Sequence, residues 1–374
     1  MKKMGILVLL LLLLGMEGKA AWAMETYTEE IDVTEIQAIM EEILEESSFD
    51  FRETMKRVLE GEEILTPERI LKALADTLRQ AFLEEKKGLV RVLVIAVAGA
   101  MVVNFSNVFK SSSVAEVSFF VIYLLLFSAM STSFYRISQT ALEALGGLLE
   151  FMKVLLPSYF MAVTFATGSA VSSAFYEVAM MLIWVAEYIL VKLVLPLIHI
   201  YFVVSLVNYI SKEDFLSKTA ELLETLIRWT TKSILGVTVG YNAVQGMIAP
   251  VADNMRRSVV LKTARLLPGI GNAIGSVAES VFGAGVLVKN AMGTVGIVVI
   301  MAIMAVPFIK IGSYCLLYKL GAALIQPISD KRILECLEGA GKGAVLLLYV
   351  TFAGAAMFLL TIAIIMASTN HLLA

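Results

Sequence analysis

Residues 291–328 read AMGTVGIVVIMAIMAVPFIKIGSYCLLYKLGAALIQPI, an apolar run whose only charged residues are Lys310 and Lys319. A helix needs about 20 consecutive apolar residues to cross a bilayer. This run is longer than one perpendicular crossing requires, and Pro307 in its middle lacks the N–H that a regular helix uses. We therefore expect a membrane element that is broken, tilted or partly outside the bilayer.

Further apolar runs surround this stretch, and the whole composition agrees with them. The chain has 374 residues, of which 59% are apolar and 17% charged, and its mean hydropathy is +0.82. Soluble domains are about 45 to 50% apolar, so a soluble globular protein is excluded. The sequence predicts an all-α, polytopic membrane protein with about eight crossings, one for each apolar run: 89–109, 114–135, 158–176, 178–210, 233–252, 269–288, 291–328 and 343–367.

An internal repeat links these runs. Leu155-Leu156-Pro157 and Leu266-Leu267-Pro268 are 111 positions apart, and so are Pro196 and Pro307, each in the middle of an overlong run. The same order of segments follows each Leu-Leu-Pro, which indicates duplication. We assign 89–113 to a first membrane helix and loop, 114–231 to one repeat, 232–342 to a second, and 343–374 to a C-terminal membrane helix.

The relative direction of the two repeats depends on how many times each long run crosses. One crossing per run gives inverted halves and places the basic residues in the cytosol, as the positive-inside bias requires. Those residues are Arg256, Arg257, Lys262, Arg265, Lys331 and Arg332. If each long run is instead a two-crossing hairpin, the cluster at 256–265 faces outward. We favour the inverted arrangement.

The N-terminus has the pattern of a secretory signal peptide. Lys2 and Lys3 precede a short apolar run, and the small-residue pattern Ala21-Trp22-Ala23 follows, so we predict a signal peptide over 1–23; an uncleaved anchor is the alternative. Residues 24–88 contain 18 acidic and 8 basic residues. They form an acidic extracytoplasmic segment whose charge disfavours nucleic acid as a partner.

Helical periodicity within this acidic segment predicts two short amphipathic helices, the second of which begins at Pro67. A docking element and a solvated spacer are both compatible with such a segment.

Charged and imidazole side chains inside apolar runs are costly, and each is therefore a candidate functional group. They are Glu116, Glu187, Lys192, His199, Glu279, Lys310 and Lys319. Polar residues collect beside the two aligned prolines, so we predict an intramembrane polar site formed by Lys192, Pro196, His199, Pro307 and Lys310. In the alternative interpretation the lysines extend toward the membrane surface and His199 binds a neighbouring helix.

Two other patterns concern helix packing and chemistry. Gly271 and Gly275 form a GxxxG step that predicts close approach of a neighbouring helix. The sequence contains no catalytic constellation, cofactor motif or metal motif, and Cys315 and Cys336 are predicted to be reduced packing residues. We therefore expect neither an enzyme nor a bound cofactor.

Two motifs are similar to those of a known family. Residues 264–272 read ARLLPGIGN and residues 288–296 read VKNAMGTVG. Together with the signal, the acidic segment and the polytopic body, they resemble stage III sporulation protein AE of endospore-forming bacteria. The resemblance implies a membrane subunit of the channel complex that joins mother cell and forespore, located in the mother-cell-derived outer forespore membrane.

Its implied partners are other membrane subunits of that complex and the lipid bilayer, and a homo-oligomer is left open. A stand-alone secondary transporter with its substrate site near Pro196 and Pro307 is the alternative, which inverted repeats with interrupted helices would favour on sequence alone.

Overall fold

The computed structural model describes residues 33–43, 50–62, 67–108, 112–167, 170–210, 215–265 and 271–370. Its regular elements are all helical, as predicted: α2 (Thr34–Ile43), α3 (Phe51–Leu59), α4 (Pro67–Val108), α5 (Ser112–Thr167), α6 (Ala170–Ile189), the π-helical turn η1 (Leu190–Val194), α7 (Leu195–Asn208), α8 (Ser217–Arg265), α9 (Gly271–Ile325) and α10 (Lys331–Asn370). The predicted signal peptide lies outside these residues.

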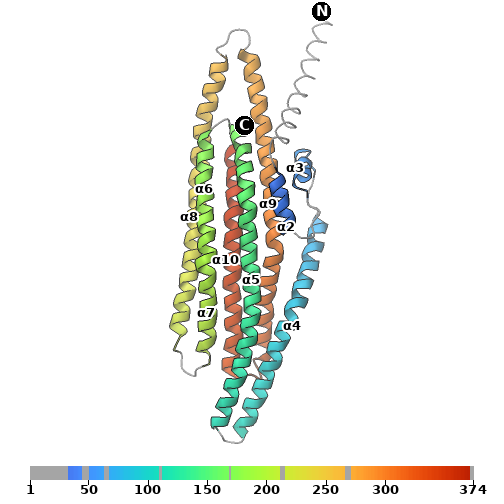
Figure 1. Ribbon diagram of the computed structural model, residues 1–374, viewed down its shortest axis with the longest axis vertical. Coiled ribbons are helices and arrows are strands. Elements are labelled where there is room, and N and C mark those ends of the chain that lie inside the picture. The colour runs from blue at the N-terminus through green and yellow to red at the C-terminus, as the bar shows by residue number, and fades with distance from the viewer. Residues whose placement is uncertain are drawn as a thin grey trace, which may run out of the picture.

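The long helices form one elongated bundle and alternate in direction (Figure 1). The chain descends along α4, rises along α5, descends through α6 and α7, and then rises, descends and rises again along α8, α9 and α10. Helix α10 lies in the middle of the bundle, where it contacts α5, α7, α8 and α9. Each long helix therefore buries part of its apolar surface against its neighbours in the bundle.

The acidic N-terminal segment is docked onto this bundle. Ile36 and Met40 of α2 and Phe51 and Met55 of α3 are buried in the same core cluster as residues of α5, α9 and α10. An N-terminal cap from Asp50, whose Oδ1 accepts a hydrogen bond from the Glu53 N–H at 2.9 Å, starts α3. Helices α2 and α3 therefore pack on the bundle of their own chain, and the helix predicted to begin at Pro67 forms the start of α4.

Four segments of the described residues are long and apolar enough to cross a membrane: Glu116–Thr164, Glu177–Asn208, Phe282–Ile325 and Lys331–Ala367. The chain is therefore described as a multipass membrane protein. The prediction of eight separate crossings is not shown, because the structure joins apolar runs that hydropathy separates. The run at 114–135 and the first part of the run at 158–176 lie in α5, and α9 contains most of the runs at 269–288 and 291–328.

The helices also continue across predicted boundaries. Helix α4 begins at Pro67, as expected, but it passes residue 88 without a break and carries the acidic segment into the first apolar run. Helix α5 passes through Pro157. At 1.5 Å per residue, the 56 residues of α5 are about 84 Å long, against a bilayer core of about 30 Å. Long helices thus extend well beyond one hydrocarbon layer.

The 111-residue offset between the two aligned prolines can be compared with the order of the helices. It places α6 and α7 on α9, and α8 on α10. The pair formed by α6–α7 and α8 and the pair formed by α9 and α10 both descend and then rise (Figure 1), and the inverted halves that we expected are not shown.

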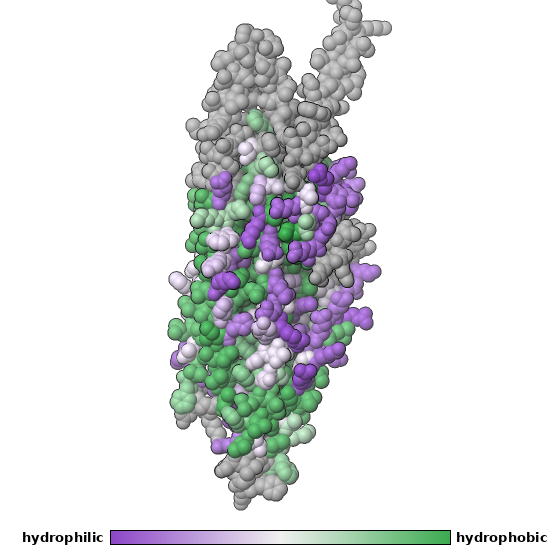
Figure 2. Space-filling view, in the orientation of Figure 1, coloured by the Kyte–Doolittle hydropathy of each residue, from purple (hydrophilic) through white to green (hydrophobic). Residues whose placement is uncertain are grey.

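The surface is polar on one flank and apolar on another. Figure 2 shows hydrophilic residues gathered over α2, α3 and the upper part of α4, whereas the left flank and the lower part of this face are largely apolar. Exposed apolar side chains are typical of helices that contact lipid or other membrane helices. They include Leu124, Leu125, Met181, Trp184, Trp229, Leu316, Leu320, Leu324 and Phe352.

Candidate functional site

Pro196 lies in the first turn of α7, directly after the π-helical turn η1. A proline removes one backbone hydrogen bond and its ring crowds the carbonyl four residues earlier, here that of Lys192. The wider π turn relieves this conflict, and the Leu195 N–H donates to the Leu190 carbonyl five residues back. The helix we expected to break at Pro196 is therefore continuous.

The two candidate side chains beside Pro196 differ in their surroundings. The Lys192 side chain is exposed. His199 is partly buried; its Nδ1 lies 3.0 Å from the Leu195 carbonyl oxygen, and its ring meets Phe134 of α5 edge-on at 5.9 Å between centroids. The His199 Nε2 is buried and has no hydrogen-bond partner among the described residues.

Pro307 and Lys310 lie in the uninterrupted helix α9. Pro307 is buried, and no π turn accompanies it. The Lys310 Nζ lies 3.3 Å from Glu84 Oε2 on α4. Lys310 therefore pairs with α4, and His199 contacts α5, so the residues predicted to form one intramembrane site have separate partners in the structure.

A polar seam lies where α4 meets α5 and α9. It is formed by Glu84, Glu85, Ser133, Arg136, Lys310, Tyr314 and Tyr318. Gly88 allows the close approach of α4, because a Cβ there would lie 3.1 Å from Ser133 Oγ and 3.3 Å from Arg136 Nη2. Tyr314 and Tyr318 stack with 4.1 Å between ring centroids.

Glu85 is the unusual member of this polar seam, since it is a carboxyl residue that is 8% exposed. Burial raises the pKa of Glu85 above its ordinary value, and the nearby Arg136 guanidinium partly opposes that shift. Sequence reasoning missed Glu85 because it counted the residue among the solvated charges of the acidic segment. The only sequence feature that pointed to close helix packing near Glu85 was Gly88, three positions later.

Glu187 of α6 is a second buried carboxyl residue, with no exposed surface. Neither of its carboxyl oxygens has a hydrogen-bond partner among the described residues. It faces Gly354 of α10, where an added Cβ would lie 2.8 Å from Glu187 Oε1. An unpartnered ionisable group inside a membrane helix is a functional candidate by default.

Lys289 of α9 is also fully buried, and its Nζ donates a hydrogen bond to the Met366 carbonyl oxygen of α10 at 3.1 Å. Met366 belongs to the last part of α10, and a cation near a helix C-terminus is favourable. We did not select Lys289 from the sequence because it lies between two apolar runs. Gly271 and Gly275 are in the first turns of α9, and their packing role stays a prediction because the structure does not describe their surroundings.

Comparison with known proteins gives a consistent result. The family model for stage III sporulation protein AE matches residues 49–369. A curated protein named stage III sporulation protein AE, from Bacillus subtilis (strain 168), is 26% identical over 319 residues, which cover 85% of this chain and 80% of the relative. No solved structure matches the chain.

Proposed function

The chain belongs to the stage III sporulation protein AE family, and from that membership we propose that it is a membrane subunit of a multiprotein channel between mother cell and forespore. In this proposal the chain acts as a non-enzymatic scaffold in secretion or feeding of the forespore. It is located in the mother-cell-derived outer forespore membrane, and its acidic N-terminal segment is extracytoplasmic.

The family match carries the sporulation role, and the surface of the bundle supports a subunit role. Large apolar side chains are exposed on several long helices, including Met181 and Trp184 on α6 and Phe352 on α10. Such surfaces suit contact with lipid and with other membrane helices. The polar flank over α2, α3 and the upper part of α4 offers a different surface, suited to partners outside the hydrocarbon layer (Figure 2).

A stand-alone secondary transporter is a second candidate, and Glu187 is the observation that favours it. A buried carboxyl group without a hydrogen-bond partner among the described residues could take up a proton or a cation during transport. Its position beside Gly354 would allow small shifts between α6 and α10 to change its surroundings.

Affinity isolation separates the two candidates. A tagged copy of the chain would replace the native gene in an endospore-forming host, and membranes from sporulating cells would be solubilised in mild detergent. The channel proposal expects restored spore formation and co-isolation of other sporulation-specific membrane proteins. Isolation of the chain alone, together with solute uptake by proteoliposomes containing only this chain, would favour the transporter.

A further inference from the structure

A cavity of about 470 Å³ opens between α8, α9 and α10. We call it the α8–α10 cavity. Three cationic side chains line it, Arg228, Lys319 and Lys342, against a single carboxylate, Glu338. The small side chains of Ala322 and Ala323 on α9 leave room between the helices.

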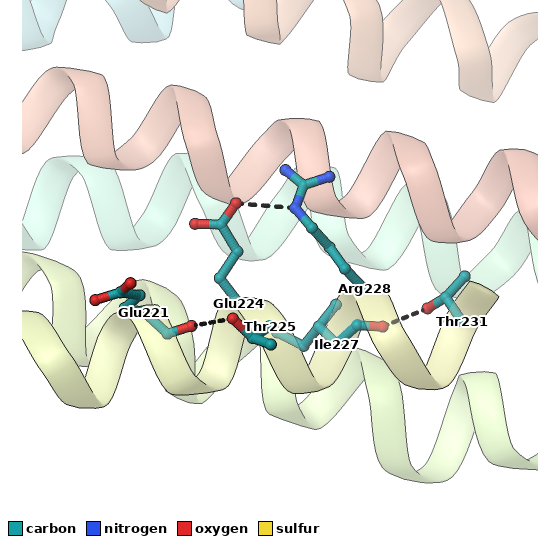
Figure 3. Close-up of polar contacts among 6 residues, drawn as sticks. All are labelled: Glu221, Glu224, Thr225, Ile227, Arg228 and Thr231. Atoms are coloured by element: carbon teal, nitrogen blue, oxygen red, sulfur yellow. Dashed lines mark hydrogen bonds and ion pairs between the residues drawn. The ribbon is translucent and has the colours of Figure 1, made fainter. Parts of the chain in front are cut away.

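Arg228 is already engaged. Its Nε lies 2.9 Å from Glu224 Oε1, one turn earlier on α8, and Figure 3 shows both side chains on the same side of that helix. The Arg228 guanidinium carbon also lies 5.8 Å from the ring centroid of Tyr349 on α10. Arg228 therefore lines the cavity with its guanidinium already paired with Glu224.

Lys319 and Lys342 are the available cations. Neither belongs to an ion pair among the residues that the structure describes. The Lys319 stem runs close to α10, where a Cβ added at Gly341 would lie 3.9 Å from Lys319 Cγ. Two ammonium groups on facing helices suit an anion with several acceptor oxygens, which is the chemistry of a phosphate.

The side chains around the α8–α10 cavity suit a bound lipid. On α9, Leu316, Leu320 and Leu324 are exposed along one face, and Trp229 on α8 is also exposed. Gln326, which lines the cavity, comes directly after the last residue of α9, where the chain turns back toward α10. A basic pocket near the end of membrane helices, with exposed apolar side chains beside it, matches a lipid with a charged headgroup and acyl chains.

We propose that the α8–α10 cavity binds the phosphate of an anionic phospholipid headgroup through Lys319 and Lys342, while the acyl chains lie along the exposed face of α9. This lipid site is independent of the channel proposal, because it requires only that the bundle is in a membrane.

The test uses the purified full chain in detergent, titrated with short-chain phosphatidylglycerol, with phosphatidylcholine of the same chain length, or with inorganic phosphate. Native mass spectrometry counts bound lipid and thermal unfolding follows its effect. The test variant combines Lys319→Gln with Lys342→Gln. The control is Lys218→Gln, which removes an exposed lysine of α8 that pairs with Glu221 and does not line the cavity.

The wild-type chain and the Lys218→Gln control should bind phosphatidylglycerol in preference to phosphatidylcholine. The double variant should lose roughly 30-fold in affinity for phosphatidylglycerol, since each lysine near a membrane surface contributes about a fivefold factor. The charge-preserving pair Lys319→Arg and Lys342→Arg should retain binding, which separates charge from loss of folding. Equal affinity for phosphatidylglycerol in the double variant and the wild type would overturn the proposal. Inorganic phosphate that binds as tightly as the lipid would also overturn it, because that result indicates a site for a free anion.

Discussion

Glu187 and Gly354 share a confined space between α6 and α10, and Leu145 of α5 closes it. A Cβ added at Gly354 would clash with Leu145 Cδ2 and would lie 2.8 Å from Glu187 Oε1. We expect Gly354→Ala to lower the free energy of unfolding by about 1 to 3 kcal/mol, the usual cost of overpacking a tight contact. Thermal unfolding of the purified chain in detergent measures the change.

Gly312→Ala is the matched control, because it places the same methyl group on α9 with nothing within 4 Å. That substitution should leave the melting temperature unchanged or raise it, since alanine favours a helix over glycine by roughly 0.5 to 1 kcal/mol. Equal behaviour of the two variants would mean that α6 and α10 are not tightly packed at Gly354.

Glu85 gives a prediction about pH. Its pKa is raised in the folded chain above 4.5, so the folded state holds this proton more tightly than the unfolded state does. The contribution of Glu85 to stability is therefore most favourable below pH 4.5, and it declines as pH rises through the folded-state pKa. We expect Glu85→Gln to raise the melting temperature at neutral pH relative to the wild type, and the gain to shrink as pH falls toward 4.5.

Asp76→Asn tests whether this gain is specific, because Asp76 is an exposed carboxylate on the same helix. Because its side chain is exposed, this substitution should leave the melting temperature at neutral pH close to that of the wild type. A lower melting temperature for Glu85→Gln than for wild type at neutral pH would mean that its interaction with Arg136 outweighs the cost of burial.

At the scale of elements, the two aligned prolines show how one residue type has different effects. Pro196 follows a π turn and is exposed, whereas Pro307 is buried in an uninterrupted helix.

Lys192→Met should be tolerated because the side chain is exposed. Lys310→Met should change the stability by less than about 1 kcal/mol, since its ion pair with Glu84 is 35% and 59% exposed. His199→Gln should cause the largest defect of the three, because it removes the ring that meets Phe134.

Spore counts, protein abundance and partner recovery measure these three substitutions. Loss of spores with normal abundance and normal partner recovery would support a solute or proton site. Full spore formation with all three replaced together would remove that hypothesis and leave the chain as a scaffold.

Sequence patterns predicted that the elements are helices and predicted where α4 begins. They did not predict that two separate apolar runs belong to one continuous helix. The all-helical class and the start of α4 at Pro67 follow from apolar periodicity and from proline geometry. The continuity of α5 through 136–157 does not, because hydropathy counts apolar residues and this stretch contains Arg136, Glu143, Glu150 and Lys153. Amphipathic residues can continue a helix whose apolar face packs on a neighbour, and only the tertiary contacts reveal that neighbour.

The candidate polar groups were predicted only in part for the same reason. Glu187 and Lys310 were visible in the sequence as ionisable residues in apolar runs. Their surroundings were not, since Glu84 is 226 positions from Lys310 and Gly354 is 167 positions from Glu187. Glu85 and Lys289 lay outside the apolar runs and became notable only through burial between helices.

At the scale of the whole molecule, the direction of the two hairpins determines which connections between helices lie on the same side of the membrane. The connection from α7 to α8 and the connection from α9 to α10 lie at the same end of the bundle (Figure 1). The residues beside the two connections are in contact, because a Cβ at Gly339 of α10 would lie 2.9 Å from Tyr209 Cε2. Inverted halves would instead place the two connections on opposite sides.

Cysteines introduced at Lys218 and Lys331 test this arrangement. Both side chains are well exposed, at 90% and 85%, and each lies just after one of the two connections. The native Cys315 and Cys336 are buried and free, so they should contribute little background to labelling with a membrane-impermeant thiol reagent. If the two hairpins run in the same direction, Lys218→Cys and Lys331→Cys should be labelled from the same side of the membrane. Both should react in intact cells without their wall, or both should react only in inverted vesicles. Glu53→Cys in α3 is the reference for the N-terminal segment. Labelling of the two positions from opposite sides would contradict the shared direction of the hairpins and would restore an odd number of crossings in each repeat, because only an odd number inverts the second unit relative to the first.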